Sequence, residues 1–133
     1  MMRGMEASAA HPTEAMAARG AQKMFGPYPA VVVDWHDGDT VHLNADLGFG
    51  IHIEAPLSCR IWGINAPELS TDEGKAALAY ALEICPVGTE VTVLSHGWDK
   101  WRGRFDGQIS LPDGTDFGAR MLEANQAVPL TGR

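Results

Sequence analysis

The chain has 133 residues, of which 45% are apolar and 20% charged, so it has room for one domain with a real core and is not composed like a disordered segment. No run approaches the roughly 20 consecutive apolar residues of a membrane span. No secretory signal is evident, so we expect a cytoplasmic protein without membrane association. The net charge of −7 argues against an extended basic surface of the kind that usually binds nucleic acid.

Residues 1–27 differ from the rest of the chain because they are rich in Ala and Met and show no strand-like alternation. We expect a tail with a short helix over residues 13–23, and Gly26-Pro27 would end any helix there. Residues 28–130 are then expected to form the folded domain.

Three runs with strand character follow, at residues 30–35, 41–47 and 51–61. The first is short, apolar and β-branched, and the other two alternate between apolar and polar residues as half-buried strands do. The Asp37-Gly38 pair predicts a tight turn after the first run. Pro56 predicts an edge or a bulge within the third.

The periodicity then changes to that of a helix. Ser70, with Glu73 three residues later, is typical of a capping box, and the helix should end before Pro86. Two further strands are expected at residues 90–95 and 105–111.

Asp116 is a candidate N-cap for a second helix, and Asn125 suits a left-handed residue at its end. The predicted fold is α+β and mainly β: a five-stranded OB-type barrel with a helix between strands 3 and 4 and a helix after strand 5. This order of elements also fits other small α+β folds.

The two cysteines, Cys59 and Cys85, are expected to be reduced and buried, because a chain of this length does not need a disulfide and neither lies in a C-x-x-C or Cys/His array. A disulfide between them is the alternative.

The first segment that suggests chemistry is Asp37-Gly38-Asp39-Thr40. A glycine between two carboxylates allows a turn that brings an acid into a cleft, and a hard cation prefers such oxygen ligands. An ordinary turn, in which Asp bonds its own backbone, is the alternative.

The second segment is Arg-Ile-Trp-Gly-Ile-Asn-Ala-Pro-Glu at residues 60–68. Arg60 lies inside an apolar strand, which is costly unless an anion meets it. Asn65 and Glu68 bring oxygen-bearing side chains to the end of that strand. The alternative is that Arg60 pairs with an internal carboxylate while Glu68 is solvated.

The third segment is Asp-Lys-Trp-Arg-Gly-Arg at residues 99–104. It predicts a basic loop that offers guanidinium groups to phosphate. An ordinary charged hairpin is the alternative.

Together and in this order, the three segments resemble the staphylococcal nuclease-like (thermonuclease) family, whose pattern is D-G-D-T, then R followed by G-I-D-A-P-E or a variant, then D-K-Y-G-R. The resemblance extends over about residues 30–128. It implies an OB barrel and a calcium-dependent phosphodiesterase, an endonuclease acting on DNA or RNA. The Asp46–Ile51 stretch is also similar to phage- or plasmid-borne relatives.

The resemblance implies roles for individual residues. Asp39, Asn65 and the carbonyl of Ala66 would bind Ca²⁺ or another divalent cation. Glu68 would orient or deprotonate the attacking water. Arg60 would hold the phosphate and stabilise its developing charge.

The resemblance also implies that Arg104 holds the phosphate together with Arg60, and that Lys100, Trp101 and Arg102 are further substrate-binding residues. Arg102 is an insertion relative to the family pattern, so either arginine of this loop is a candidate.

Asn65 replaces an aspartate of the family and should weaken cation binding, because an amide carries no charge. Two other classes of function remain open: a non-catalytic OB-fold module that binds nucleic acid or a protein, and a structural protein that uses the barrel as a scaffold. We expect a monomer.

Overall fold

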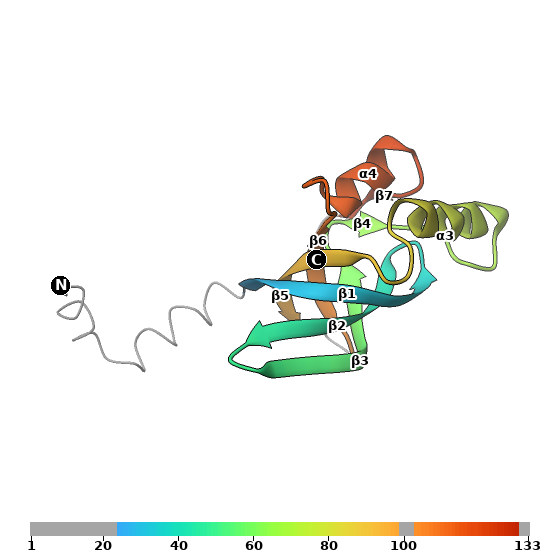
Figure 1. Cartoon of the computed structure of the whole chain (residues 1–133). Helices are drawn as coiled ribbons and strands as arrows, with labels where there is room; N and C mark the ends of the chain where they lie inside the picture. Colours follow the sequence, from blue (N-terminus) through green and yellow to red (C-terminus); the bar gives the residue numbers. More distant parts are fainter. Residues whose placement is uncertain (1–23, 99–102, 131–133) are drawn as a thin grey trace.

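The computed structural model describes residues 24–98 and 103–130 (Figure 1). The predicted helix at residues 13–23 lies outside this part of the chain. The elements in chain order are β1 (Phe25–Asp37), β2 (Thr40–Gly48), β3 (Ile51–Ile61), β4 (Ile64–Asn65), α3 (Asp72–Ile84), β5 (Glu90–Trp98), β6 (Phe105–Ser110), α4 (Phe117–Glu123) and β7 (Val128–Pro129).

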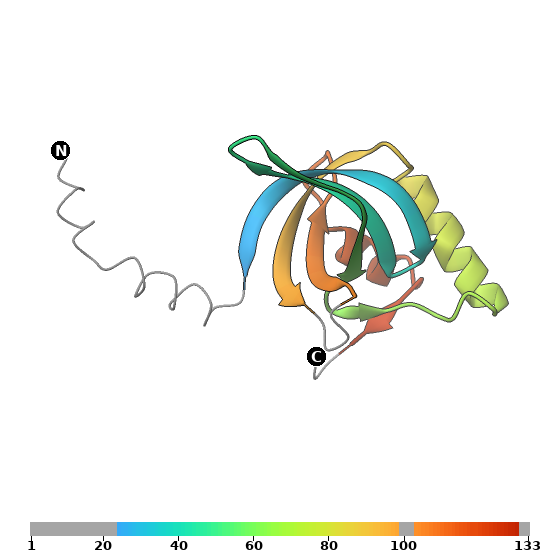
Figure 2. The same cartoon turned by 90° about the horizontal axis from the view of Figure 1, so that it is seen from below.

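Five of the strands close into a barrel in the order β1-β2-β3-β6-β5, and β5 pairs back with β1 (Figure 2). All neighbours are antiparallel except β3 and β6, which run parallel. The helix α3 lies between β3 and β5, and α4 follows β6. The predicted five-stranded OB-type barrel with two helices is therefore confirmed.

The alternation read from the sequence separates the core from the outer face. On β2, Val41, Leu43 and Ala45 point inward and are at most 4% exposed. Both helices lie on the side of the barrel away from the β2–β3 hairpin (Figure 1). Trp35 of β1 stacks on Phe117 of α4 with ring centroids 4.7 Å apart, so α4 is sealed against the barrel.

The helix ends show one correction. The N-cap of α3 is Thr71 and not Ser70: the Thr71 hydroxyl accepts a hydrogen bond from the Gly74 N–H at 3.0 Å and donates one to the Glu68 carbonyl at 2.7 Å. One hydroxyl thus satisfies both the helix and the preceding loop. The prediction for α4 is confirmed, with Asp116 as N-cap and Asn125 left-handed at φ 59°.

The third predicted strand carries the expected irregularity. Leu43 pairs with Leu57 and Ala45 with Ile53, so β3 uses four residues where β2 uses two. The bulge falls where Pro56 predicted it. The short β4–β7 pair is an addition that the sequence did not indicate.

The described residues contain two buried cysteines, Cys59 and Cys85, and both are free thiols as expected. Burial raises the pKa of Cys85 to about 11, so this thiol is unreactive at neutral pH. In the part of the chain that the structure describes, no helix is long and apolar enough to cross a membrane.

Candidate functional site

The turn between β1 and β2 holds two carboxylates next to each other. The Asp39 N–H donates to the Asp37 carboxylate at 3.1 Å. A Cβ at Gly38 would lie 3.0 Å from the Cβ atoms of both Ala66 and Ala77. The turn is therefore packed under α3 and the segment after β4, and its glycine is required for space.

Asp39 is a buried acid, with 7% of its surface exposed. One carboxylate oxygen accepts the Ala66 N–H at 2.9 Å, and the other accepts the Thr40 hydroxyl at 3.3 Å. Burial raises the pKa of Asp39, and the neighbouring Asp37 raises it further. The Ala66 N–H and the positive charge of Arg60 act in the opposite direction. The effects that raise the pKa of Asp39 outweigh those that lower it. Raised carboxylate pKa values of this kind are frequent at functional sites.

Arg60 lies beside this turn through strand pairing. It is opposite Thr40 in the β2–β3 ladder, and the Ile61 N–H donates to the Asp39 carbonyl at 2.8 Å. Its Nη2 donates to Asn65 Oδ1 at 3.2 Å. Its Nε is buried and has no hydrogen-bond partner among the described residues. The alternative that Arg60 pairs with an internal carboxylate is not observed within the described ranges, where the guanidinium instead bonds an amide.

Asn65 and Ala66 reach the turn because β4 is anchored by the C-terminal segment. Ile64 pairs with Pro129 and Asn65 with Val128, while the Leu130 N–H donates to the Gly63 carbonyl at 2.8 Å. Ile64 is 1% exposed and fastens this segment to the core. Two hydrogen bonds thus join the predicted site residues in pairs, Asp39 with Ala66 and Arg60 with Asn65.

Glu68 comes two residues after Ala66, and no bond joins its carboxylate to the cluster in the part of the chain that the structure describes. Its side chain is exposed, and among the described residues its carboxylate makes no hydrogen bond or ion pair. Its backbone, by contrast, is held firmly. A Cβ at Gly74 would lie 1.8 Å from the Glu68 carbonyl oxygen, so the first turn of α3 sits directly on this residue.

Only the end of the third segment is described. Arg104 is half-buried and immediately precedes Phe105, which pairs with Cys59 next to Arg60. Lys100, Trp101 and Arg102, the predicted substrate-binding residues, lie outside the described residues.

Sequence reasoning overlooked two acids near this site. Asp37 was counted as one of the two carboxylates of the first segment but was given no role at the site, although the D-G-D-T spacing already places it next to Asp39. Asp106 is 7% exposed and stands opposite Arg60 in the parallel β3–β6 pairing. No signal in the sequence indicated Asp106, because the pairing of β3 with β6 is a tertiary feature.

The donor set suits a hard cation. Asp39, Asn65 and the Ala66 carbonyl offer oxygen only, which Ca²⁺ and Mg²⁺ prefer. The described ranges hold no group of three or more His, Cys, Asp or Glu side chains placed to bind a metal. A cation here would be held by a single carboxylate together with an amide and a carbonyl oxygen, a donor set that carries little negative charge.

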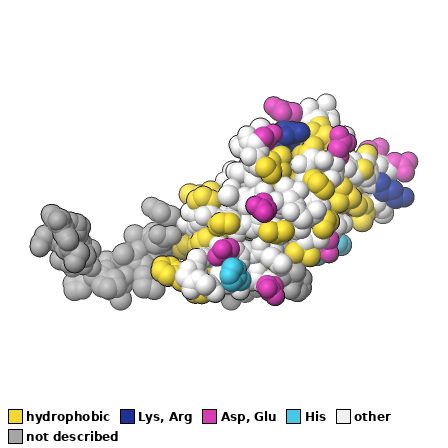
Figure 3. Space-filling view, in the orientation of Figure 1, with side chains coloured by type: hydrophobic (Ala, Val, Ile, Leu, Met, Phe, Trp, Pro, Cys, Tyr) yellow, Lys and Arg dark blue, Asp and Glu magenta, His cyan; other side chains and the backbone are white. Residues whose placement is uncertain are grey.

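Charge is unevenly distributed over the molecule. The face in Figure 3 carries Asp, Glu and His side chains over the strands, and Lys and Arg side chains show among its coloured residues only near α3 and α4. Four of the ten basic residues of the chain belong to the second and third segments: Arg60, Lys100, Arg102 and Arg104. The basic residues are thus concentrated in the segments that supply the predicted site.

Fold and geometry together define a small OB-type barrel with a buried acid, an arginine and oxygen donors beside one barrel turn. No family model matches this chain. A search of curated proteins found no similar one.

Proposed function

We propose that the protein is a metal-dependent nuclease that hydrolyses phosphodiester bonds in DNA, RNA or both. The observation that carries this proposal is the Arg60 guanidinium, whose Nε is buried without a hydrogen-bond partner among the described residues. Leaving a buried donor unsatisfied costs about 1–3 kcal/mol. A phosphate, with two oxygens in one plane, matches a guanidinium in bidentate fashion. The unsatisfied donor therefore supports a phosphate site beside Asp39.

The chemistry follows from charge. A phosphodiester resists attack because it is already negative, so positive groups fixed around it lower the barrier. Arg60 and Arg104 would hold the phosphate and stabilise the charge that develops as the bond breaks. Glu68, whose side chain is exposed, would orient the attacking water or accept its proton. A divalent cation held by Asp39, Asn65 and Ala66 would add positive charge at the phosphate oxygens.

A plasmid-nicking assay with Ca²⁺, and with chelator, tests the proposal. We expect nicking by the wild type only with the cation and a loss of activity in Glu68→Gln. Arg60→Gln should lower the rate about 10²–10³-fold, by analogy with the loss of one preorganised donor. Lys75→Gln, which removes an exposed charge on α3, serves as the matched control and should cleave normally. Nicking in chelator, or equal activity of Arg60→Gln and Lys75→Gln, would exclude the mechanism.

The role of Asn65 has a separate test. Its amide brings no charge, and its oxygen already accepts from Arg60. We expect Asn65→Asp to reach half-maximal activity at a lower Ca²⁺ concentration than the wild type. Calorimetric titration of the metal checks the same affinity directly, and an unchanged affinity would remove Asn65 from the ligand set.

The choice between the loop arginines is equally direct. We favour Arg104, because it enters β6 beside the strand that carries Arg60. Arg104→Ala should lose most of its cleavage activity and Arg102→Ala should retain it. The reverse result would assign the phosphate to Arg102.

A binding module without catalysis is the second candidate. It is favoured by the uncharged Asn65 and by the acidic strand face. Retention of oligonucleotide binding with no cleavage under any divalent cation would support this candidate.

A further inference from the structure

Two aromatic rings stack on the outer face of the barrel, away from the core. Trp62 and His96 lie with ring centroids 4.2 Å apart and planes inclined by only 5°. Both residues are half-buried. Trp62 belongs neither to the buried core nor to the apolar residues packed against it. The ring pair therefore lies outside the barrel core.

The stack is built by three strands. The Trp62 N–H donates to the Gly107 carbonyl of β6 at 2.8 Å, and Ser95 of β5 pairs with Gly107 from the other side. Trp62 and His96 thus come from either side of β6. His96 is held in place because its Nε2 bonds Gln108 Oε1 at 2.8 Å. The ring pair is fixed before any ligand arrives.

The position of the stack relative to Arg60 is the decisive feature. Trp62 follows Arg60 by two residues, in the turn directly after β3, so their Cα atoms are at most about 7 Å apart. Arg60 in turn stands opposite Asp106 on β6, two residues before Gln108. A phosphate held by Arg60 would therefore have this aromatic surface beside it, within reach of the attached nucleoside.

We infer that Trp62 and His96, with Gln108 as the positioning residue, form a nucleobase subsite next to the phosphate of the proposed nuclease. Aromatic surfaces accept any base through its π face, so the subsite would not select sequence. A base inside a duplex is already stacked and cannot occupy it. The ligand is accordingly an unpaired nucleotide in a single strand or in a locally opened duplex. This inference rests on the proposed function for the neighbouring phosphate.

The test compares two fluorescently labelled oligonucleotides of equal length, one of thymidines and one with abasic sites throughout. Both carry the same phosphates, so a difference in Kd reports the bases. Anisotropy is measured in chelator, which prevents cleavage. We expect the wild type to bind the thymidine strand more tightly. Trp62→Ala should weaken that binding about tenfold or more and leave the abasic strand unaffected.

Three further variants sharpen the result. Trp62→Phe should restore most of the preference, because it keeps a ring. Gln108→Ala should lose part of it, because His96 is no longer held. Phe49→Ala removes an aromatic that is 99% exposed on the β2–β3 hairpin and should bind like the wild type. Equal weakening of both strands by Trp62→Ala would show a merely structural role and overturn the inference.

Failure of the inference is distinguishable from failure of the proposed function. If the protein nicks plasmid but does not distinguish the two strands, the nuclease proposal stands and the base subsite is wrong. If it distinguishes them but cleaves nothing, the subsite stands and belongs to a binding module.

Discussion

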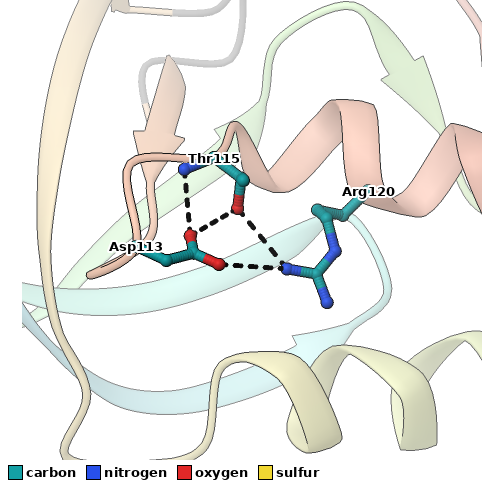
Figure 4. Close-up of polar contacts among 3 residues, drawn as sticks. All are labelled: Asp113, Thr115 and Arg120. Carbon is teal, nitrogen blue, oxygen red and sulfur yellow. Dashed lines mark hydrogen bonds and ion pairs between the residues drawn. The ribbon is translucent and has the colours of Figure 1, made fainter.

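In the turn at Asp113-Gly114, between β6 and α4, the Asp113 carboxylate interacts with residues close to it in the sequence (Figure 4). One Asp113 oxygen accepts the Thr115 N–H at 3.0 Å and the Thr115 hydroxyl at 2.6 Å, while the other lies 3.7 Å from Arg120. The side chain is exposed, and the Thr115 hydroxyl is the main cause of its lowered pKa. These interactions stabilise the ionised form of the Asp113 carboxylate.

The turn at Asp37-Gly38 begins with the same dipeptide and ends differently. Its next carboxylate, Asp39, is buried, sits beside a second acid and has a raised pKa. Besides the hydroxyl of the adjacent Thr40, it accepts the N–H of Ala66, 27 residues further along the chain. The comparison teaches that a local motif supplies a turn, whereas the residues packed over it decide whether the carboxylate is exposed with a lowered pKa or buried with a raised one.

The largest expected difference between the two turns is in activity. Asp39→Asn should abolish metal-dependent cleavage, a loss of at least about 10²-fold. It should also raise the Tm of the metal-free protein at pH 7, because a buried charge is removed. Asp113→Asn is the control and should cleave as the wild type does. Normal cleavage by Asp39→Asn would break the comparison.

The helices beside the two turns extend the contrast. An alanine at Gly74 of α3 would collide with the Glu68 carbonyl oxygen, at 1.8 Å, whereas one at Gly118 of α4 would have its closest contact at 3.3 Å, with Asp116. We expect Gly74→Ala to cost about 1–3 kcal/mol of stability, as overpacking does, and to reduce cleavage by displacing Glu68. Gly118→Ala should be close to neutral. Urea unfolding and the nicking assay measure both effects, and equal stabilities would contradict the packing.

Alanine substitutions at the two turn glycines, Gly38 and Gly114, should destabilise the protein for different reasons. At Gly38 an alanine would press on Ala66 and Ala77 from 3.0 Å, which we expect to cost about 1–3 kcal/mol. At Gly114 nothing lies within 4 Å, but the φ of 87° is left-handed, so alanine should cost about 1 kcal/mol through the backbone alone. Asparagine tolerates that conformation, so Gly114→Asn should recover part of the loss. Gly38→Asn should recover none, and recovery there would show that conformation, not space, limits the first turn.

The smallest effect is on the pH dependence of stability in metal-free protein. The pKa of Asp39 is raised in the folded protein. Its contribution to the free energy of unfolding therefore falls as the pH rises from the ordinary pKa of 3.8 through the folded pKa. Asp113 has a lowered folded pKa, so its contribution is present above 3.8 and is lost as pH falls through the folded value. Relative to wild type, Asp39→Asn should therefore gain stability with rising pH and Asp113→Asn should lose it. Thermal melts from pH 3 to 7 measure both trends, and parallel curves would refute the opposite shifts.

Much of the fold followed from periodicity and turn chemistry. The alternation at residues 41–47 predicted β2, and Asp116 and Asn125 marked the two ends of α4. The boundaries were less accurate: the first strand begins at Phe25, not at residue 30, because pairing with Ser95 of β5 extends it. The N-cap is Thr71, one residue later than predicted, and its hydroxyl also donates to the Glu68 carbonyl.

The candidate site was predictable as a set of residues but not as an arrangement. The three segments named Asp39, Arg60 and Asn65, and their spacing along the chain said which residue types were available. Their contacts depend on groups distant in sequence: the β4–β7 pairing that carries Asn65, and the pairing of β3 with β6 that brings Asp106 opposite Arg60.

Local sequence thus decided the strands, the helices, the turns and the inventory of acids, arginines and amides, because these depend on neighbours a few residues apart. Tertiary structure alone decided which Asp-Gly turn is buried, which guanidinium N–H has no partner within residues 24–98 and 103–130, and which aromatic rings meet across β6. Burial and pKa depend on what the rest of the chain places around a group, and periodicity carries no record of that.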